Sequence, residues 1–185
     1  MAKVNVFLIS DDLFFYEGVK AILDDMAGVS VRLMKVDLLI YYLRIEDIQE
    51  DDVFIVAKNL IGNMLSALII LDYYSANIIL LNSYGNQSKA VGCFLRHLPD
   101  RVNAEGIISS VNNHALLKLP KMWSLSYSET EVMSHRLRGL SVKNINFLFS
   151  INVKTIYTHQ RNGLAKMGAK SFTNLYRLNG LPYNY

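Results

Sequence analysis

The 185-residue sequence predicts an α/β domain followed by an all-α domain. Two observations predict the α/β part: short apolar runs recur along residues 1–118, and stretches with helical spacing of apolar residues separate them. A third observation is a change in periodicity and charge near residue 119, which sets apart residues 119–124 as a linker and residues 125–185 as a helical domain. Apolar residues make up 51% of the chain, which is sufficient for folded cores.

Strands and helices alternate along residues 1–118. The predicted strands cover residues 4–9, 29–36, 53–57, 77–81 and 104–109, and the predicted helices cover residues 14–26, 38–48, 60–74, 87–98 and 112–119. The first run is apolar except at Asn5, which is typical of a strand buried on both faces. The first helix places Phe15, Val19 and Leu23 on one stripe. This alternation predicts a parallel sheet with helices on both faces, a flavodoxin-like (βα)5 fold.

Acidic residues stand at the end of the first predicted strand and before the third. Asp11 and Asp12 follow the first strand, and Asp52 opens the apolar run DVFIV. The arrangement resembles the receiver domain of response regulators. That resemblance implies an acidic pair that helps to hold magnesium, and a run that leads to a phosphate-accepting aspartate.

The phosphorylation chemistry of receivers is not conserved in this sequence. The acceptor position falls on Ala57, or on Lys58 after a shift of one residue, and neither side chain forms an acyl phosphate. Ser109 and Ser110 follow the predicted fifth strand, where receivers carry a lysine. We therefore expect an atypical receiver-like domain that is not phosphorylated and binds no metal. Asp12 is then expected to cap a helix.

The charge of the chain is unevenly distributed. Up to Leu119 there are 10 Lys and Arg against 14 Asp and Glu, a balance of −4; from Pro120 onward there are 9 against 2, a balance of +7. A basic C-terminal third indicates a polyanionic partner for that part alone. Apolar runs are too short to cross a bilayer, and no signal peptide is evident, so the expected location is the cytoplasm, at the nucleoid. The single cysteine, Cys93, excludes an internal disulfide and a Cys-based zinc site.

The C-terminal third contains four predicted helices. Ser126 and Glu129 form a capping box that starts the first helix. The third helix covers residues 153–167, and a tight turn at residues 150–151 separates it from the second. The side chains placed to cap the four helices are Ser126, Ser141, Asn152 and Ser171. Helices of this length with this turn predict a helix-turn-helix.

A continuous register over residues 125–175 strengthens this prediction. Its motifs are Leu125-Ser126, Ser128-Glu129, Glu131-Val132-Met133, Gly139-Leu140-Ser141, Ile145, Val153-Lys154-Thr155-Ile156, Thr158-His159, Asn162, Leu164 and Lys166-Met167. These residues resemble the C-terminal domain of LuxR/FixJ-type (NarL-type) transcription regulators. The resemblance implies that residues 153–167 form a recognition helix that enters the major groove of DNA. Asn146 departs from the family, which often has alanine there, and we expect it to loosen the contact between the two helices of the motif.

The third helix has two distinct faces. Val153, Ile156, Leu164 and Met167 are expected to point inward. The candidate DNA-contacting residues are Lys143, Lys154, Thr155, Tyr157, Thr158, His159, Arg161, Asn162 and Lys166. Tyr157 and Arg161 suit base contact, phosphate contact or a solvated face, and His159 suits a phosphate or the helical scaffold.

The function that these features predict is a bacterial transcription regulator. We expect a sequence-specific dimer on double-stranded DNA that acts without phosphorylation, with RNA polymerase or a rival repressor as the candidate protein partner. An alternative is an auxiliary subunit that forms a heterodimer with a complete response regulator. No catalytic constellation is visible, so we expect no enzyme activity, no cofactor and no membrane partner.

Overall fold

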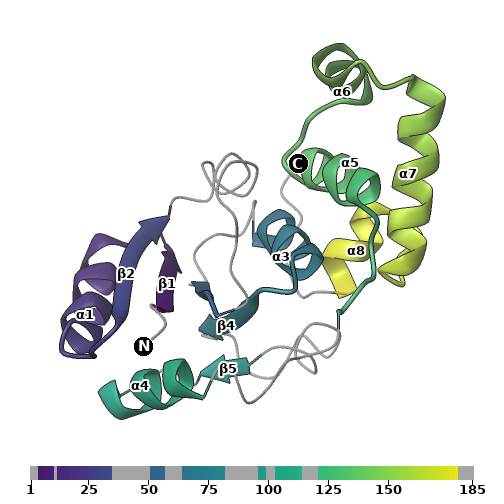
Figure 1. The fold of residues 1–185 in the computed structure, drawn as a ribbon. Helices are drawn as coiled ribbons and strands as arrows, with labels where there is room; N and C mark the ends of the chain where they lie inside the picture. Colours follow the sequence, from purple (N-terminus) through teal and green to yellow (C-terminus); the bar gives the residue numbers. More distant parts are fainter. Residues whose placement is uncertain are drawn as a thin grey trace.

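The computed structural model describes residues 4–10, 12–34, 51–56, 64–81, 96–98, 103–113 and 121–178. A parallel sheet occupies the N-terminal part, and a group of helices follows it in the C-terminal part (Figure 1). Helix α3 (Met64–Tyr73) lies between the sheet and the C-terminal helices. The predicted combination of an α/β part and an all-α part is confirmed.

The sheet has five strands in the described residues. They are β1 (Val4–Ile9), β2 (Val29–Met34), β3 (Val53–Val56), β4 (Asn77–Leu81) and β5 (Arg96–Leu98). Their order is β2-β1-β3-β4-β5, and every neighbouring pair is parallel. This order is the flavodoxin-like one that the alternation predicts.

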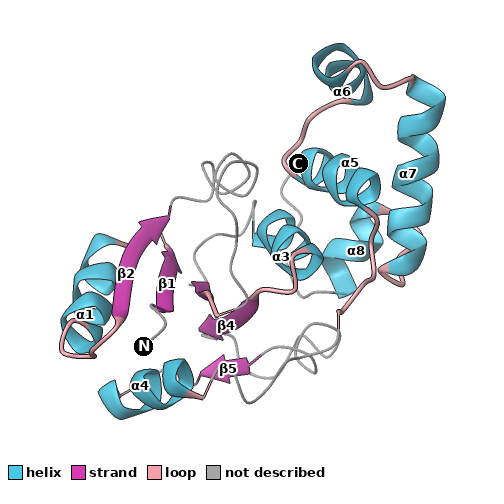
Figure 2. Ribbon diagram, viewed as in Figure 1, coloured by secondary structure: helices cyan, strands magenta, loops and turns pink. Residues whose placement is uncertain are grey.

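Alternate residues of the central strands point to opposite faces of the sheet, and each face has its own hydrophobic core. Val6 and Leu8 pack with α1 (Leu13–Leu23) and α4 (Ala104–Asn112) on one face. Phe7 and Phe54 pack with α3 on the other face, and the centroids of their stacked rings lie 4.9 Å apart. Figure 2 shows α1 and α4 on one side of the strands and α3 on the other. A sheet covered on both faces requires apolar strands throughout, which is why β1 and β3 read as continuous apolar runs.

One pair of predicted elements is wrong. Residues 96–98 belong to strand β5, although they were expected to end a helix, and the strand predicted at residues 104–109 is helix α4. The side chain of Asn103 caps α4 by accepting the N–H of Gly106 at 2.9 Å. Ile107 and Val111 are four residues apart and both buried, so the apolar pair at 107–108 is part of a helical stripe. Ser109 and Ser110 therefore lie within a helix, and the fifth strand ends at Leu98.

Other differences concern element ends or undescribed residues. The first helix ends at Leu23 instead of residue 26, and Gly28 turns the chain into β2 with φ +84°. The helix predicted at 38–48, residues 87–95 and residues 114–119 lie outside the described residues, as do Asp11, Ala57 and Lys58. Within the described ranges no helix combines the length and apolar character that a membrane crossing requires.

Four helices make up the C-terminal part that the structure describes. They are α5 (Tyr127–Leu137), α6 (Val142–Phe149), α7 (Val153–Lys166) and α8 (Phe172–Leu178). Val132 of α5, Ile145 of α6 and Ile156 of α7 are fully buried and form a small core of their own. This core fixes α6 and α7 against α5, as expected for a helix-turn-helix.

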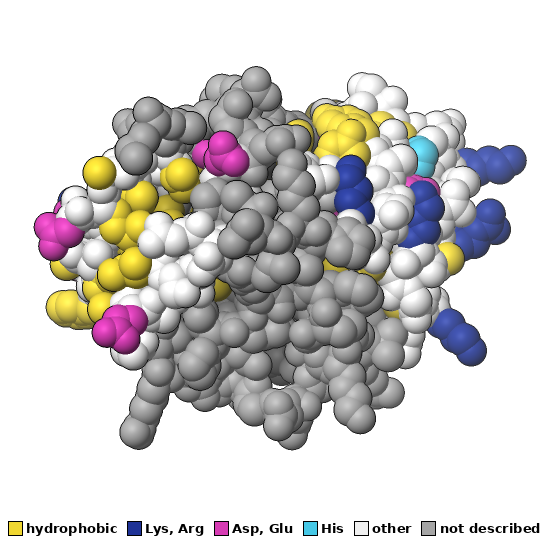
Figure 3. Space-filling model, turned by 60° about the horizontal axis from the view of Figure 1, so that its bottom comes forward, with side chains coloured by type: hydrophobic (Ala, Val, Ile, Leu, Met, Phe, Trp, Pro, Cys, Tyr) yellow, Lys and Arg dark blue, Asp and Glu magenta, His cyan; other side chains and the backbone are white. Residues whose placement is uncertain are grey.

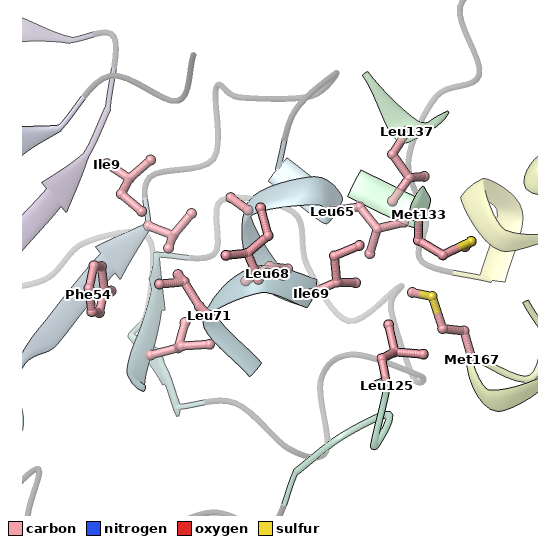
Figure 4. Packing of buried hydrophobic residues seen from close by; sticks show 14 of the residues in the cluster. Ile9, Phe54, Leu65, Leu68, Ile69, Leu71, Leu125, Met133, Leu137 and Met167 are labelled. Carbon is pink, nitrogen blue, oxygen red and sulfur yellow. The ribbon is translucent and has the colours of Figure 1, made fainter. Parts of the chain in front are cut away.

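Helix α3 is buried along its length. Every residue from 65 to 72 is buried, including two polar ones, Ser66 and Asp72. In Figure 4, Leu68 and Leu71 lie toward Phe54 of the sheet, whereas Leu65 and Ile69 lie toward the C-terminal helices. A helix that is apolar on all sides needs partners on all sides. The sheet provides one partner and α5 the other.

Candidate nucleic-acid interface

The start of α5 is fixed by the predicted capping box. The N–H of Glu129 is 3.3 Å from Ser126 Oγ, and the N–H of Ser126 is 2.8 Å from Glu129 Oε2. This reciprocal pair satisfies two backbone donors at the beginning of the helix. Glu129 also accepts a hydrogen bond from Lys166 Nζ at 2.7 Å, which ties the last turn of α7 to the first turn of α5.

That ion pair alters the ionisation of Glu129. Burial by itself raises the pKa of the carboxyl, but the hydrogen bonds from Lys166 and Ser126 outweigh it, so the pKa lies below its ordinary value. The Lys166 ammonium also reaches the carbonyl of Ser124 at 3.2 Å. Lys166 therefore has a structural contact inside the motif in addition to its predicted one with phosphate.

The turn between α6 and α7 is held by two polar residues. Ser150 adopts a left-handed conformation with φ +54°, which ends α6. Asn146 Nδ2 donates to the carbonyl of Ile151 across the turn at 2.8 Å. The amide of Asn146 therefore closes the turn, and its expected effect on the packing of the two helices stays a prediction.

Both helices of the motif carry a lysine in their first turn. Ser141 Oγ accepts the N–H of Asn144 and starts α6, and Asn152 Oδ1 accepts the N–H of Lys154 and starts α7. Lys143 and Lys154 are each the second residue of their helix, both are exposed, and neither first turn contains an acidic residue. A helix N-terminus carries partial positive charge and normally favours acidic side chains. Two exposed lysines at these termini make a strongly cationic edge suited to an anion.

The inner face of α7 is only partly the one predicted. Ile156, Leu164 and Met167 are buried as expected. Val153 is 42% exposed, so its predicted inward position is wrong. It is the first residue of the helix, next to the exposed cap residue Asn152.

A close approach between α5 and α7 depends on Gly163. A Cβ built there lies 2.6 Å from Met133 Cγ and 3.1 Å from Met133 Sδ. Met133 is fully buried, so its side chain occupies the space that a larger residue on α7 would need.

The opposite face of α7 is open to solvent. Its exposed side chains are Lys154, Thr155, Tyr157, Thr158, Arg161, Asn162, Ala165 and Lys166. Tyr157 is 55% exposed, which leaves a large part of its aromatic ring available for contact with another molecule. His159 is half-buried, and Thr158 Oγ1 donates to the carbonyl of Lys154 at 3.0 Å. The structure thus brings the predicted residues of α7 to one surface, except that His159 lies at its edge.

This surface has a single sign of charge. Residues 141–168 include Lys143, Lys154, Arg161 and Lys166 but no Asp or Glu. In Figure 3, Lys and Arg side chains project from the side of the molecule on which α7 lies. The polyphosphate backbone of nucleic acid is the common biological anion that matches such a surface.

The ends of strands β1 and β5, where receiver domains hold their phosphorylation site, show no comparable cluster of charged side chains in the described residues. Asp12 Oδ1 accepts the N–H of Phe15 at 3.1 Å and so caps α1, as predicted. Ser10 Oγ accepts the N–H of Asp12 at 3.0 Å. The lysine expected in receivers after the fifth strand is also missing at the corrected position, where Leu98 is followed by Pro99.

Comparison with known proteins agrees with this geometry. Residues 123–179 match the family model described as bacterial regulatory proteins, luxR family. Full-length FixJ from B. japonicum is 21% identical over 96% of each chain, with a TM-score of 0.51. The RcsB response regulator of Salmonella typhimurium is 21% identical over 98% of each chain, with a TM-score of 0.51. A structure of two RcsB dimers bound to two parallel DNAs is 18% identical over 95% of this chain and 97% of that chain, with a TM-score of 0.50. At these identities, the solved structures establish a shared fold.

Proposed function

Because residues 123–179 match the family model of luxR-family bacterial regulatory proteins, we propose that the chain is a member of that family and a sequence-specific, DNA-binding transcription regulator. The observation that carries the proposal is the exposed outer face of α7, which holds cationic, aromatic and hydroxyl side chains and no carboxylate. A buried inner face holds the same helix firmly against α5. Helix α7 is therefore the element that enters the major groove.

We assign separate roles to the side chains of this surface. Arg161 donates its guanidinium fork to guanine, and Tyr157 offers its ring to a thymine methyl group. Lys154 and Thr155 at the start of α7, with Lys143 at the start of α6, bind phosphates. The further contacts are assigned to Thr158, His159, Asn162 and Lys166. Lys166 contributes less than Lys154, since Glu129 already holds its ammonium group.

We further propose that the regulator works as a dimer and without phosphorylation. The dimer is supported by the family resemblance and by RcsB, a protein of the same fold that binds DNA as dimers. Independence from phosphorylation is supported by the sequence, which has Ala57 and Lys58 at the acceptor position. We place the domain boundaries at residues 1–118 and 125–185, with a linker at 119–124, and place the protein in the cytoplasm with its DNA.

Selection of bound sites from a random DNA pool tests this function. A dimer with one α7 per half-site selects an inverted or direct repeat with its half-sites about one helical turn apart. Affinity falls steeply with salt because phosphate contacts release counterions. Recovery of no common sequence, or binding insensitive to salt, contradicts the proposal.

A second candidate function is favoured by the missing acceptor at position 57. A regulator without its own switch is suited to pair with a complete response regulator and to bind DNA as a heterodimer. Size-exclusion and gel-shift measurements, with the protein alone and mixed with candidate regulators, separate the two. Specific binding by the isolated homodimer removes the need for a partner.

A further inference from the structure

The C-terminal helices and the sheet share one continuous hydrophobic core. Cluster members run from Phe7 and Phe54 of the sheet, through Leu65 and Ile69 of α3, to Met133 of α5 (Figure 4). The remaining members on the C-terminal side are Leu125, Leu137, Leu164, Met167, Ala169 and Leu175. Contacts between α3 and α5 are as extensive as those between neighbouring strands β1 and β3. Exposing such a surface on separation is costly, because apolar burial is the main force that stabilises folded proteins.

Buried polar groups on α3 are also satisfied, by α5 at Ser66 and by the linker at Asp72. Ser66, which is 1% exposed, donates its hydroxyl to the carbonyl of Ser134 on α5 at 3.2 Å. Asp72 accepts the backbone N–H groups of Met122 at 2.7 Å and Trp123 at 3.2 Å. Burial raises the pKa of the Asp72 carboxyl, whereas these N–H groups and the charge of Lys121 act to lower it. If the two parts separated, these donors and acceptors would lose partners placed for them.

A third set of contacts closes the edge of the junction. Lys121 Nζ donates to the carbonyl of Tyr73 at 2.9 Å and lies 5.3 Å from the centre of the Tyr73 ring. The rings of Tyr73 and Tyr127 meet edge to face with centroids 6.1 Å apart. Tyr127 is 51% exposed, so this edge is accessible from solvent.

The DNA-facing surface of α7 lies away from this junction. Figure 1 shows α5 between α3 and α7, so the sheet and the outer face of α7 are on opposite sides of α5. The residue of α7 that belongs to the shared core, Leu164, is on its buried face. Tyr157 and Arg161 remain exposed while the junction is closed. In the described part of the chain, docking therefore leaves the candidate DNA surface uncovered.

We propose that the outer face of α3 is a permanent docking surface for the helix-turn-helix unit, and that the docked chain is the form that binds DNA. The receiver-like sheet is then a fixed scaffold for α7, and no signal has to release the unit. The second half of this proposal rests on the proposed DNA-binding function, whereas the first half does not.

Unfolding tests the first half. Trp123 is the single tryptophan, and it lies at the junction, so its fluorescence reports separation of the two parts. Far-ultraviolet circular dichroism reports the loss of helices throughout the chain. We expect the two signals to change together in one urea transition, because the shared core makes one cooperative unit. A fluorescence change that precedes the loss of helix overturns permanent docking.

A cross-link tests the second half. Tyr73→Cys and Tyr127→Cys, in a Cys93→Ser background, are joined by a short bismaleimide that fixes the edge of the junction. The cross-linked chain is expected to bind its selected DNA site within about threefold of the same variant before cross-linking, a difference below about 1 kcal/mol. A loss on the order of tenfold or more overturns the proposal, because it means that binding requires undocking. The two single-cysteine variants treated with the same reagent are the controls for modification itself.

The two possible failures are distinguishable. If the unmodified chain selects no DNA site, the proposed function fails, and docking is still judged by the coincidence of the two unfolding signals. If the unmodified chain binds DNA and the cross-linked chain does not, the proposed function stands and the docked form is inactive.

Discussion

Helices α3 and α7 differ in how much of their surface they bury. Residues 65–72 of α3 are all buried, between the sheet on one side and α5 on the other. Helix α7 buries only one face, through Ile156, Gly163 and Leu164, and leaves the other exposed. A helix that is buried on all sides has no surface for a partner outside the chain, whereas an amphipathic helix with one exposed face does.

Because of this difference, stability of the fold and DNA binding are expected to depend on different helices. Changes in α3 are expected to act on the stability of the fold, because residues of this helix form the middle of the core that the sheet shares with the C-terminal helices. Changes on the outer face of α7 are expected to act on DNA binding, because those side chains are exposed; Lys166, which is paired with Glu129, is the exception. Substitutions in the two helices test whether stability and DNA binding change independently.

Replacement of Ile69 by alanine is expected to lower the free energy of unfolding by about 2–5 kcal/mol, because it leaves a cavity at a fully buried site. Urea denaturation measures the loss. The affinity of the folded fraction for DNA should not change. Leu13→Ala is the control, since Leu13 is 59% exposed on α1 and its loss should cost less than about 0.5 kcal/mol. Equal costs for the two variants contradict the two-sided burial of α3.

The sequence predicts the sheet well because buried parallel strands have a distinctive pattern. Strands β1 and β4 lie at the predicted residues, and the strand order follows from the alternation of elements. Strand β5 was missed because it is short and contains Arg96 and His97, which do not form an apolar run. The conformation of β5 depends on its pairing with β4, and this pairing cannot be predicted from the residues of β5 alone.

The sequence pattern of residues 125–175 predicted which residues face outward on α7, but it did not predict the contacts that hold this helix in place. The outer face of α7 follows from helical periodicity, which fixes which residues share a side. The pairing of Lys166 with Glu129 joins residues far apart in sequence, so periodicity does not reveal it. The continuous apolar character of residues 67–71 was a visible sign that α3 is covered on both sides, and its partner, α5, becomes evident only in the fold.

Replacement of Arg161 by alanine is expected to weaken binding to the selected site by about 1–3 kcal/mol and to relax base preference at one position of each half-site. Fluorescence anisotropy with matched and mismatched duplexes measures both effects. Stability should not change, because Arg161 is exposed. Lys170→Ala removes an exposed positive charge outside α7 and is the control for net charge. If both variants lose the same affinity for every duplex, Arg161 does not read bases.

Replacement of Lys166 by methionine is expected to lower stability by about 1–2 kcal/mol at neutral pH, because Glu129 loses a charge-assisted hydrogen bond. The folded pKa of Glu129 lies below its ordinary value of 4.5, so the ion pair stabilises the fold above that pH and stops doing so as pH falls through the folded pKa. Urea denaturation at a series of pH values should show the wild-type advantage shrinking on acidification. An advantage that is constant with pH means that the methylene groups of Lys166, and not its charge, are responsible.

The smallest effect is expected in the turn that orients α7. Replacement of Ser150 by glycine should raise the free energy of unfolding by about 0.5–1 kcal/mol, because Ser150 has φ +54° and glycine adopts this conformation without steric cost. Ser109→Gly is the matched control: Ser109 lies inside α4 with ordinary helical backbone, so the same change should lower stability by a few tenths of a kcal/mol or more, up to about 1. DNA affinity is the sharper measurement. Asn146 holds the carbonyl of Ile151 independently of residue 150, so the turn should keep its geometry and the Ser150→Gly variant should bind as the wild type does. If the Ser150→Gly variant is more stable but binds DNA more weakly, the hydrogen bond of Asn146 is not sufficient to fix the orientation of α7 after the turn.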